Sequence, residues 1–120
     1  MTTRAFNSSP YPLIQGDTRP PLTLQIGDST GAAADFSRFA SLVVTAHWRE
    51  KDAAAVTASI VMSAVDASAG QYRIDAWPTA ALAGDEGRYE LEIEVDYLGD
   101  GTSVETVFDT VQFKLHEDFA

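Results

Sequence analysis

The chain has 120 residues, which is enough for one domain with a core of its own but not for two. It carries 18 acidic and 8 basic residues, and the net charge of −10 disfavours contact with nucleic-acid backbones and anionic membrane surfaces. The chain has no cysteine, which excludes disulfides and thiolate metal sites, and no apolar window is long enough for a membrane-spanning helix.

The N-terminal residues predict an extended arm. Four of the five prolines lie within the first 21 residues, where fixed φ angles and missing amide donors disfavour helices and central strands. We expect residues 1–20 to form the arm, with a frayed tip, and residues 21–120 to form the folded domain. Four apolar side chains of the arm are predicted to anchor it on a neighbouring subunit: Phe6, Tyr11, Leu13 and Ile14. Residues 13–15 are also a candidate for strand addition to a neighbour's sheet edge. No apolar signal segment follows Met1, which predicts synthesis in a cytoplasm.

From residue 22 onward, apolar and polar residues alternate with the period of half-buried strands. This pattern predicts strands over residues 22–26, 42–49, 56–65, 70–76, 88–97 and 103–116. In the third of these, the inward positions are predicted to be Val56, Ala58, Ile60, Met62 and Ala64. In the fourth, they are Tyr72, Ile74 and Ala76.

The second half of the chain carries the clearest strand signal. Residues 88–97 place an acidic row on the outward face, which we interpret as solvated: Glu90, Glu92, Glu94 and Asp96. A helical turn is predicted at 78–83, and a hairpin turn at Gly99–Gly101. The alternation changes phase within the last strand, which predicts a bulge near Asp109 and Thr110.

Six or seven short strands without an amphipathic helix predict an all-β fold, and more narrowly an immunoglobulin-like β-sandwich of about seven strands. Tyr89 opens the best strand where such domains keep a tyrosine corner, and Trp48 stands where they keep a core tryptophan. The bridging cysteine pair is missing. The residues predicted to form the core are Trp48, Tyr89, Leu91, Ile93 and Phe113.

Five short motifs occur in an order and spacing that resemble one family. They are Gly16–Leu22, Asp35–Ser37, Gly70–Tyr72 followed by Trp77, Gly87–Glu90 and Gly99–Gly101. Over residues 15–115 the chain resembles the immunoglobulin-like N-terminal domain of phage baseplate upper proteins. It departs from the family at Arg38, where a glycine is usual, and near Phe108, where a proline is usual.

The resemblance implies a structural protein of a tailed-phage virion that anchors or connects subunits in the tail or baseplate. Its partners would be other virion proteins, including copies of itself in a symmetric assembly, and it would reach the virion after synthesis in the host cytoplasm. Because the chain ends at Ala120, the resemblance implies the anchoring module without a receptor-binding domain.

The sequence offers no catalytic constellation, so we expect no enzyme activity, cofactor or metal. His47 and His116 are the only histidines and lack metal-ligand spacing, and no Gly-x-Ser-x-Gly segment exists. The acidic row has the carboxyl spacing of an inverting glycosidase, but no cleft is implied around it. A serine-histidine-acid triad assembled from distant segments has no support in the sequence.

Two alternatives remain open at this point. A capsid decoration protein would use the same fold and the same kind of contacts. A carbohydrate-binding module would attach the particle to host glycans through exposed aromatic rings, with Trp77 as the leading stacking residue and Tyr97 and Tyr11 as further candidates. The competing interpretation of Trp77 is a lid over one end of the sandwich. Nucleic acid and membrane insertion are not expected.

Overall fold

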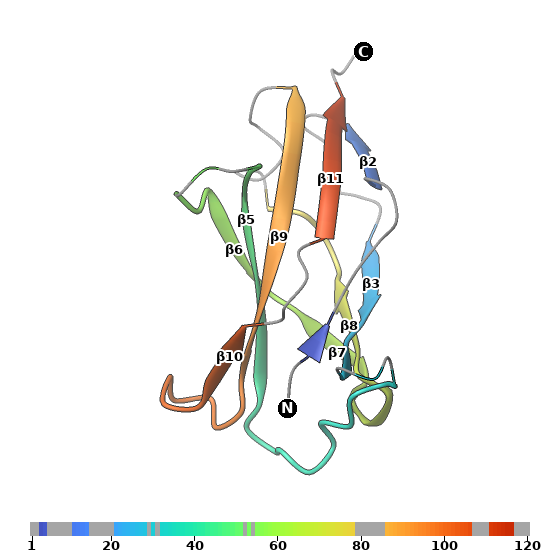
Figure 1. Ribbon diagram of the computed structural model, residues 1–120, viewed down its shortest axis with the longest axis vertical. Helices are drawn as coiled ribbons and strands as arrows, with labels where there is room; N and C mark the ends of the chain where they lie inside the picture. The colour runs from blue at the N-terminus through green and yellow to red at the C-terminus, as the bar shows by residue number, and fades with distance from the viewer. Residues whose placement is uncertain are drawn as a thin grey trace.

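The architecture comes from a computed structural model. It describes residues 3–4, 11–14, 21–28, 30, 32–51, 53, 55–78, 86–106 and 111–116. These residues form an all-β structure apart from one 3₁₀ turn, Ala67–Ala69 (Figure 1). Within the same ranges, no helix has the length and apolar character needed to cross a membrane.

The larger sheet contains the long central strands. Its order is β2 (Tyr11–Ile14), β11 (Val111–His116), β9 (Gly87–Asp96), β5 (Val43–Glu50) and β6 (Ala58–Val61). β10 (Val104–Thr106) also pairs with β9, beyond the end of β11. β2 runs parallel to β11, and the remaining pairs of this sheet are antiparallel.

The smaller sheet is antiparallel, in the order β3 (Leu22–Gln25), β8 (Gln71–Ile74) and β7 (Ser63–Asp66). A two-residue pairing joins β1 (Thr3–Arg4) to β4 (Gly27–Asp28). Buried side chains of both main sheets belong to one hydrophobic core. This arrangement is compatible with a β-sandwich.

Four aromatic rings form the centre of the core. Trp48 stacks on Tyr89 with ring centroids 4.9 Å apart, and meets Trp77 and Phe113 at 5.3 Å each. Such pairs add to the apolar area that the rings bury. All five residues predicted to form the core are buried, which confirms the period-two assignment: Trp48, Tyr89, Leu91, Ile93 and Phe113.

The predicted strand 56–65 is wrong as a single element. The structure divides it into β6 on the larger sheet and β7 on the smaller one, with buried Met62 between them. Val56 is 50% exposed and Ala64 is also exposed, although both were predicted to point inward. Alternation reports which side chains point inward but not which sheet a strand joins, so a chain that crosses between sheets keeps a strand-like pattern.

The register against β9 changes within the last predicted strand. Thr106 pairs with Glu94 and Val111 with Leu91, so five steps along this strand match three along β9. The predicted bulge residues, 109 and 110, lie outside the described residues, as do residues 79–83 of the predicted helical turn. Ala76 is exposed rather than inward, because β8 ends at Ile74.

Gly70 gives a testable consequence of this fold. It has φ 67° after the 3₁₀ turn, and its carbonyl accepts a hydrogen bond from Ile26 N at 2.8 Å. An added Cβ would press on the carbonyl oxygens of Ile26 and Ala34. Gly101 has φ 80° but open space around it. We expect Gly101→Ala to cost about 1 kcal/mol of unfolding free energy from left-handed strain alone, and Gly70→Ala to cost at least about 2 kcal/mol more.

Urea unfolding of the two alanine variants measures this difference. Equal losses at the two positions would contradict the backbone clash inferred at Gly70.

Candidate protein-interaction surfaces

Part of the predicted arm belongs to the larger sheet of its own chain. The backbone of Tyr11–Ile14 forms β2, in register with Phe113 to His116 of β11. The extended conformation agrees with the prolines, and within the chain this stretch pairs with β11. Its addition to a neighbour's sheet edge remains a prediction. Phe6 lies outside the described residues. The contact of the four arm side chains with a neighbouring subunit remains a prediction.

Trp77 does not offer a stacking surface. The side chain is only 2% exposed and packs edge-on against Trp48 and Phe113, with ring centroids 5.3 Å apart in both pairs. Its predicted role in glycan stacking is therefore wrong. The large ring fills the core beyond the end of β8, as the lid interpretation requires. Tyr97 is half-buried and lines a pocket described below.

The acidic row of β9 is not a uniformly solvated face. Glu90 is 7% exposed and accepts hydrogen bonds from Arg49 Nε at 2.9 Å and Gln112 Nε2 at 3.3 Å. Arg49 Nη2 also lies 3.9 Å from a carboxylate oxygen of Glu92. The register explains the pairing, since Arg49 is directly opposite Glu90 on neighbouring strands. The predicted solvated row is thus wrong at Glu90, which is held in an ion pair.

The structure brings together a serine, a histidine and a carboxylate that lie far apart in sequence. His47 Nδ1 is 2.8 Å from Ser59 Oγ, and its Nε2 is 3.6 Å from Glu94 Oε2. Ser59 is the cross-strand partner of His47, whereas Glu94 is a diagonal neighbour, directly opposite Thr45. Strand N–H groups are engaged in pairing along β5, so they do not converge as an oxyanion hole would require. The geometry is that of cross-strand polar contacts.

His116 lies at the end of β11 and is exposed. Among the residues that the structure describes, no group of three His, Cys, Asp or Glu side chains is placed to hold a metal ion.

A segment without charged side chains contributes the outer strand of each main sheet. We call residues 53–65 the edge segment; it has no charged residue, although the whole chain carries a net charge of −10. Its strands β6 and β7 are the outer strands of the two main sheets and follow each other directly (Figure 1). Residues 58–66 span about 30 Å at the usual strand rise, and the one charged residue among them is Asp66, at the end of β7. Sequence periodicity did not predict this edge, because it assigned β6 and β7 to a single strand.

Apolar side chains and backbone polar groups are both accessible on this edge. Val61 is 70% exposed, and Val56 and Val65 are about half exposed. Met62 N donates to Val44 O at 2.9 Å. Because bonding alternates along an antiparallel strand, Ser59 and Val61 turn their N–H and C=O groups to the outer side. A pocket of about 290 Å³ borders the edge and is lined partly by Val61, Met62 and Ala64.

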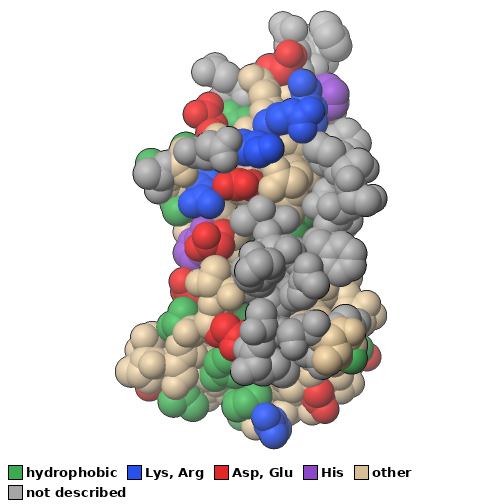
Figure 2. Space-filling view, in the orientation of Figure 1, with side chains coloured by type: hydrophobic (Ala, Val, Ile, Leu, Met, Phe, Trp, Pro, Cys, Tyr) green, Lys and Arg blue, Asp and Glu red, His purple; other side chains and the backbone are tan. Residues whose placement is uncertain are grey.

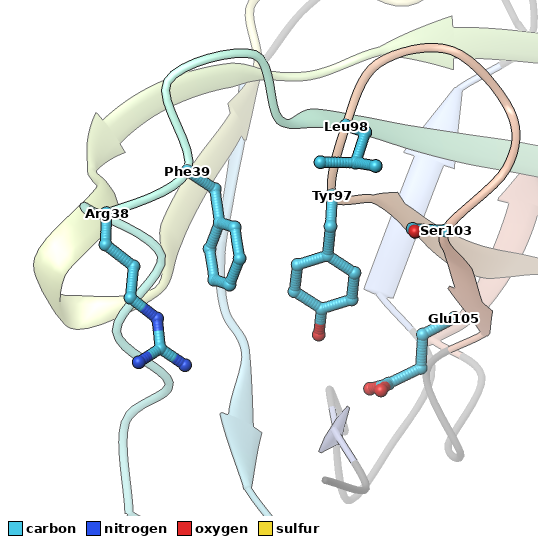
Figure 3. A pocket seen from close by; sticks show the side chains of 6 residues that line it. All are labelled: Arg38, Phe39, Tyr97, Leu98, Ser103 and Glu105. Carbon is cyan, nitrogen blue, oxygen red and sulfur yellow. The ribbon is translucent and has the colours of Figure 1, made fainter.

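A second pocket lies at the end of the molecule where the β9–β10 hairpin meets the loop before β5; we call it the tip pocket. It measures about 380 Å³ and is lined by Arg38, Phe39, Tyr97, Leu98, Ser103 and Glu105 (Figure 3). Hydrophobic side chains gather at the lower end of the molecule, where these segments lie (Figure 2). The pocket is open and has an aromatic wall.

The hairpin that borders the tip pocket is held by its own carboxylates. Asp96 accepts hydrogen bonds from Gly99 N at 3.0 Å and Gly101 N at 2.8 Å, which confirms the predicted turn. Asp100 accepts from the hydroxyl and amide of Thr102, and these bonds lower the pKa of Asp100. The pKa of Tyr97 is raised, first by burial and then by the nearby carboxylate of Glu105. These contacts fix the hairpin side of the pocket.

No protein-family model matches the chain, and no curated protein matches it at a significant level.

Proposed function

We propose that this chain is a non-enzymatic structural protein of a tailed-phage virion that connects subunits of the tail or baseplate through protein contacts. The proposal joins the resemblance in sequence to one observation on the structure, the uncharged edge segment with exposed Val56, Val61 and Val65. Long, uncharged strand edges are what proteins that remain monomeric usually avoid or cover. An edge of this kind suits pairing with a strand of a neighbouring subunit.

The distribution of charge supports the same use. Charged side chains of both signs are spread over the visible face of the molecule in Figure 2. Copies with a net charge of −10 repel each other in general, whereas contact along the edge segment brings no like charges from that segment together. Two subunits would then associate in one orientation, along the edge segment, and not through nonspecific attraction.

We further propose that the fold is immunoglobulin-like. In such domains one sheet carries the core tryptophan on a central strand and the corner tyrosine near the start of a neighbouring strand. Trp48 on β5 and Tyr89 near the start of β9 have these positions, and they stack on each other. The intersheet disulfide of antibody domains has no counterpart here, because the chain has no cysteine.

If Tyr89 forms a tyrosine corner, removing its hydroxyl should lower the free energy of unfolding. Tyr89→Phe removes only a hydroxyl, so a corner hydrogen bond would appear as a loss on the order of 1 kcal/mol in unfolding free energy. Leu91→Ile, a change at a neighbouring core position without a polar atom, controls for repacking. Chemical denaturation gives both values. A Tyr89→Phe variant as stable as the native chain would remove the corner assignment and leave the two sheets in place.

The location in the particle is tested on purified virions. Immunogold labelling of intact particles should place the protein on the tail or baseplate. Labelling on the head would instead assign the same fold to capsid decoration. Detection only as a free cytosolic protein, never in purified particles, would overturn the structural function altogether. The carbohydrate-binding alternative has lost its leading residue, because Trp77 is buried.

The edge is tested by adding charge to it. Val61→Lys places a cation on the outer strand and should fold, because Val61 is largely exposed, but it should be lost from particles. Ala76→Lys adds the same charge at an exposed position outside the strands and should be incorporated normally. Incorporation of both variants at the native level would show that assembly uses another surface.

A further inference from the structure

The tip pocket holds a carboxylate that the described structure leaves incompletely satisfied. Oxygen Oε1 of Glu105 is buried and has no hydrogen-bond partner, although the carboxylate is hydrogen-bonded to the Tyr97 side chain. Glu105 also makes no ion pair with Arg38, the cation that lines the same pocket. Glu105 as a whole is only partly buried and lines the open pocket, where a cationic donor would pair with its carboxylate and offset the cost of partial burial.

The rest of the pocket is suited to a flat organic cation. The rings of Phe39 and Tyr97 meet edge to face with centroids 4.9 Å apart and form an aromatic wall next to Glu105 (Figure 3). The guanidinium of Arg38 already lies 5.0 Å above the Phe39 ring. The Phe39 ring is therefore already in contact with the guanidinium of Arg38. Glu105 lies on the other side of the pocket, next to Tyr97.

We propose that the tip pocket binds an arginine side chain of a partner protein, with the guanidinium between the Tyr97 ring and the Glu105 carboxylate. Guanidinium offers planar stacking and paired N–H donors in one group, which matches an aromatic ring beside a carboxylate. Nearby Leu98 and Val104 are exposed on the hairpin and would contact the apolar surroundings of that arginine. The pocket volume of about 380 Å³ accommodates a side chain of this size.

That the arginine belongs to a protein partner rests on the proposed function; the preference of the pocket for a guanidinium does not. The direct experiment is an NMR titration of the isolated chain with N-acetyl-arginine methylamide, and in parallel with the citrulline analogue, which has the same shape without the charge. Shifts from the arginine compound should concentrate on Phe39, Tyr97, Leu98 and Glu105. The citrulline compound should bind at least fivefold more weakly.

Two variants separate the pocket from the general acidity of the chain. Glu105→Gln should weaken binding of the arginine compound at least fivefold. Glu50→Gln removes the same charge from an exposed position at the far end of β5, about 20 Å along the sheet from the level of Glu105 by the strand rise, and should change the affinity less than twofold. Amide spectra confirm that each variant retains the fold.

Three results would overturn the proposal: equal binding of the two compounds, full binding by Glu105→Gln, or shifts spread over the acidic face of β9. Failure of the proposed function is a separate outcome. A chain that binds the arginine compound in the pocket but never enters particles would keep the guanidinium site and remove the virion partner.

Discussion

Truncating Trp48 to alanine is expected to lower the free energy of unfolding by about 3 to 5 kcal/mol, as for other large-to-small changes in cores. The side chain is fully buried and touches three other aromatic rings, Tyr89, Trp77 and Phe113. Alanine would leave a cavity where both sheets meet, and rings held by several neighbours cannot close it fully. The loss approaches the whole stability of an ordinary domain of this size.

Trp48→Phe is the informative companion variant. The indole Nε1 of Trp48 is buried without a hydrogen-bond partner, so phenylalanine removes an unsatisfied donor together with part of the ring. The smaller cavity and the relieved donor act in opposite directions, and we expect a loss of about 1 to 2 kcal/mol. Urea unfolding followed by circular dichroism measures both variants. If Trp48→Ala unfolds outright, the phenylalanine variant still tests the packing: a loss above about 3 kcal/mol would contradict it.

Local alternation was sufficient to predict the strands that lie in the middle of the larger sheet. Along β5 and β9, every second side chain enters the core, and each strand has a neighbour on both sides. The pattern in the sequence then coincides with burial. This is why Val44, Trp48, Leu91 and Ile93 could be assigned to the core without a structure.

Features that depend on pairing between distant segments could not be predicted in the same way. Nothing local to residues 58–66 indicates that β6 and β7 join different sheets, and the exposed edge follows from that division. The tip pocket joins Phe39 to Tyr97 and Glu105 across a large separation in sequence. The burial of Glu90 depends on Arg49 being directly opposite in the register. Each is a long-range contact that composition and periodicity do not encode.

Of the ion pairs among the described residues, the pair of Arg49 with Glu90 is expected to contribute most to the free energy of unfolding. Arg49 Nε lies 2.9 Å from Glu90, and the Glu90 side chain is almost fully covered. Arg49→Ala removes the guanidinium and leaves the carboxylate in that covered position. We expect a loss of about 2 to 3 kcal/mol, below the usual range for a fully buried pair because Arg49 itself is partly exposed.

The chain provides a matched control for this effect. Arg73 pairs with Asp75 at 2.7 Å, but both side chains are about half exposed. Arg73→Ala should therefore cost less than about 1 kcal/mol, as surface pairs do. Adding Glu90→Gln to Arg49→Ala should recover part of the larger loss, because a neutral amide is less costly to bury than a carboxylate. Guanidinium ions would screen the pairs, so urea is the denaturant of choice. Equal losses for the two arginine variants would show that Glu90 gains no more from its partner than an exposed carboxylate does.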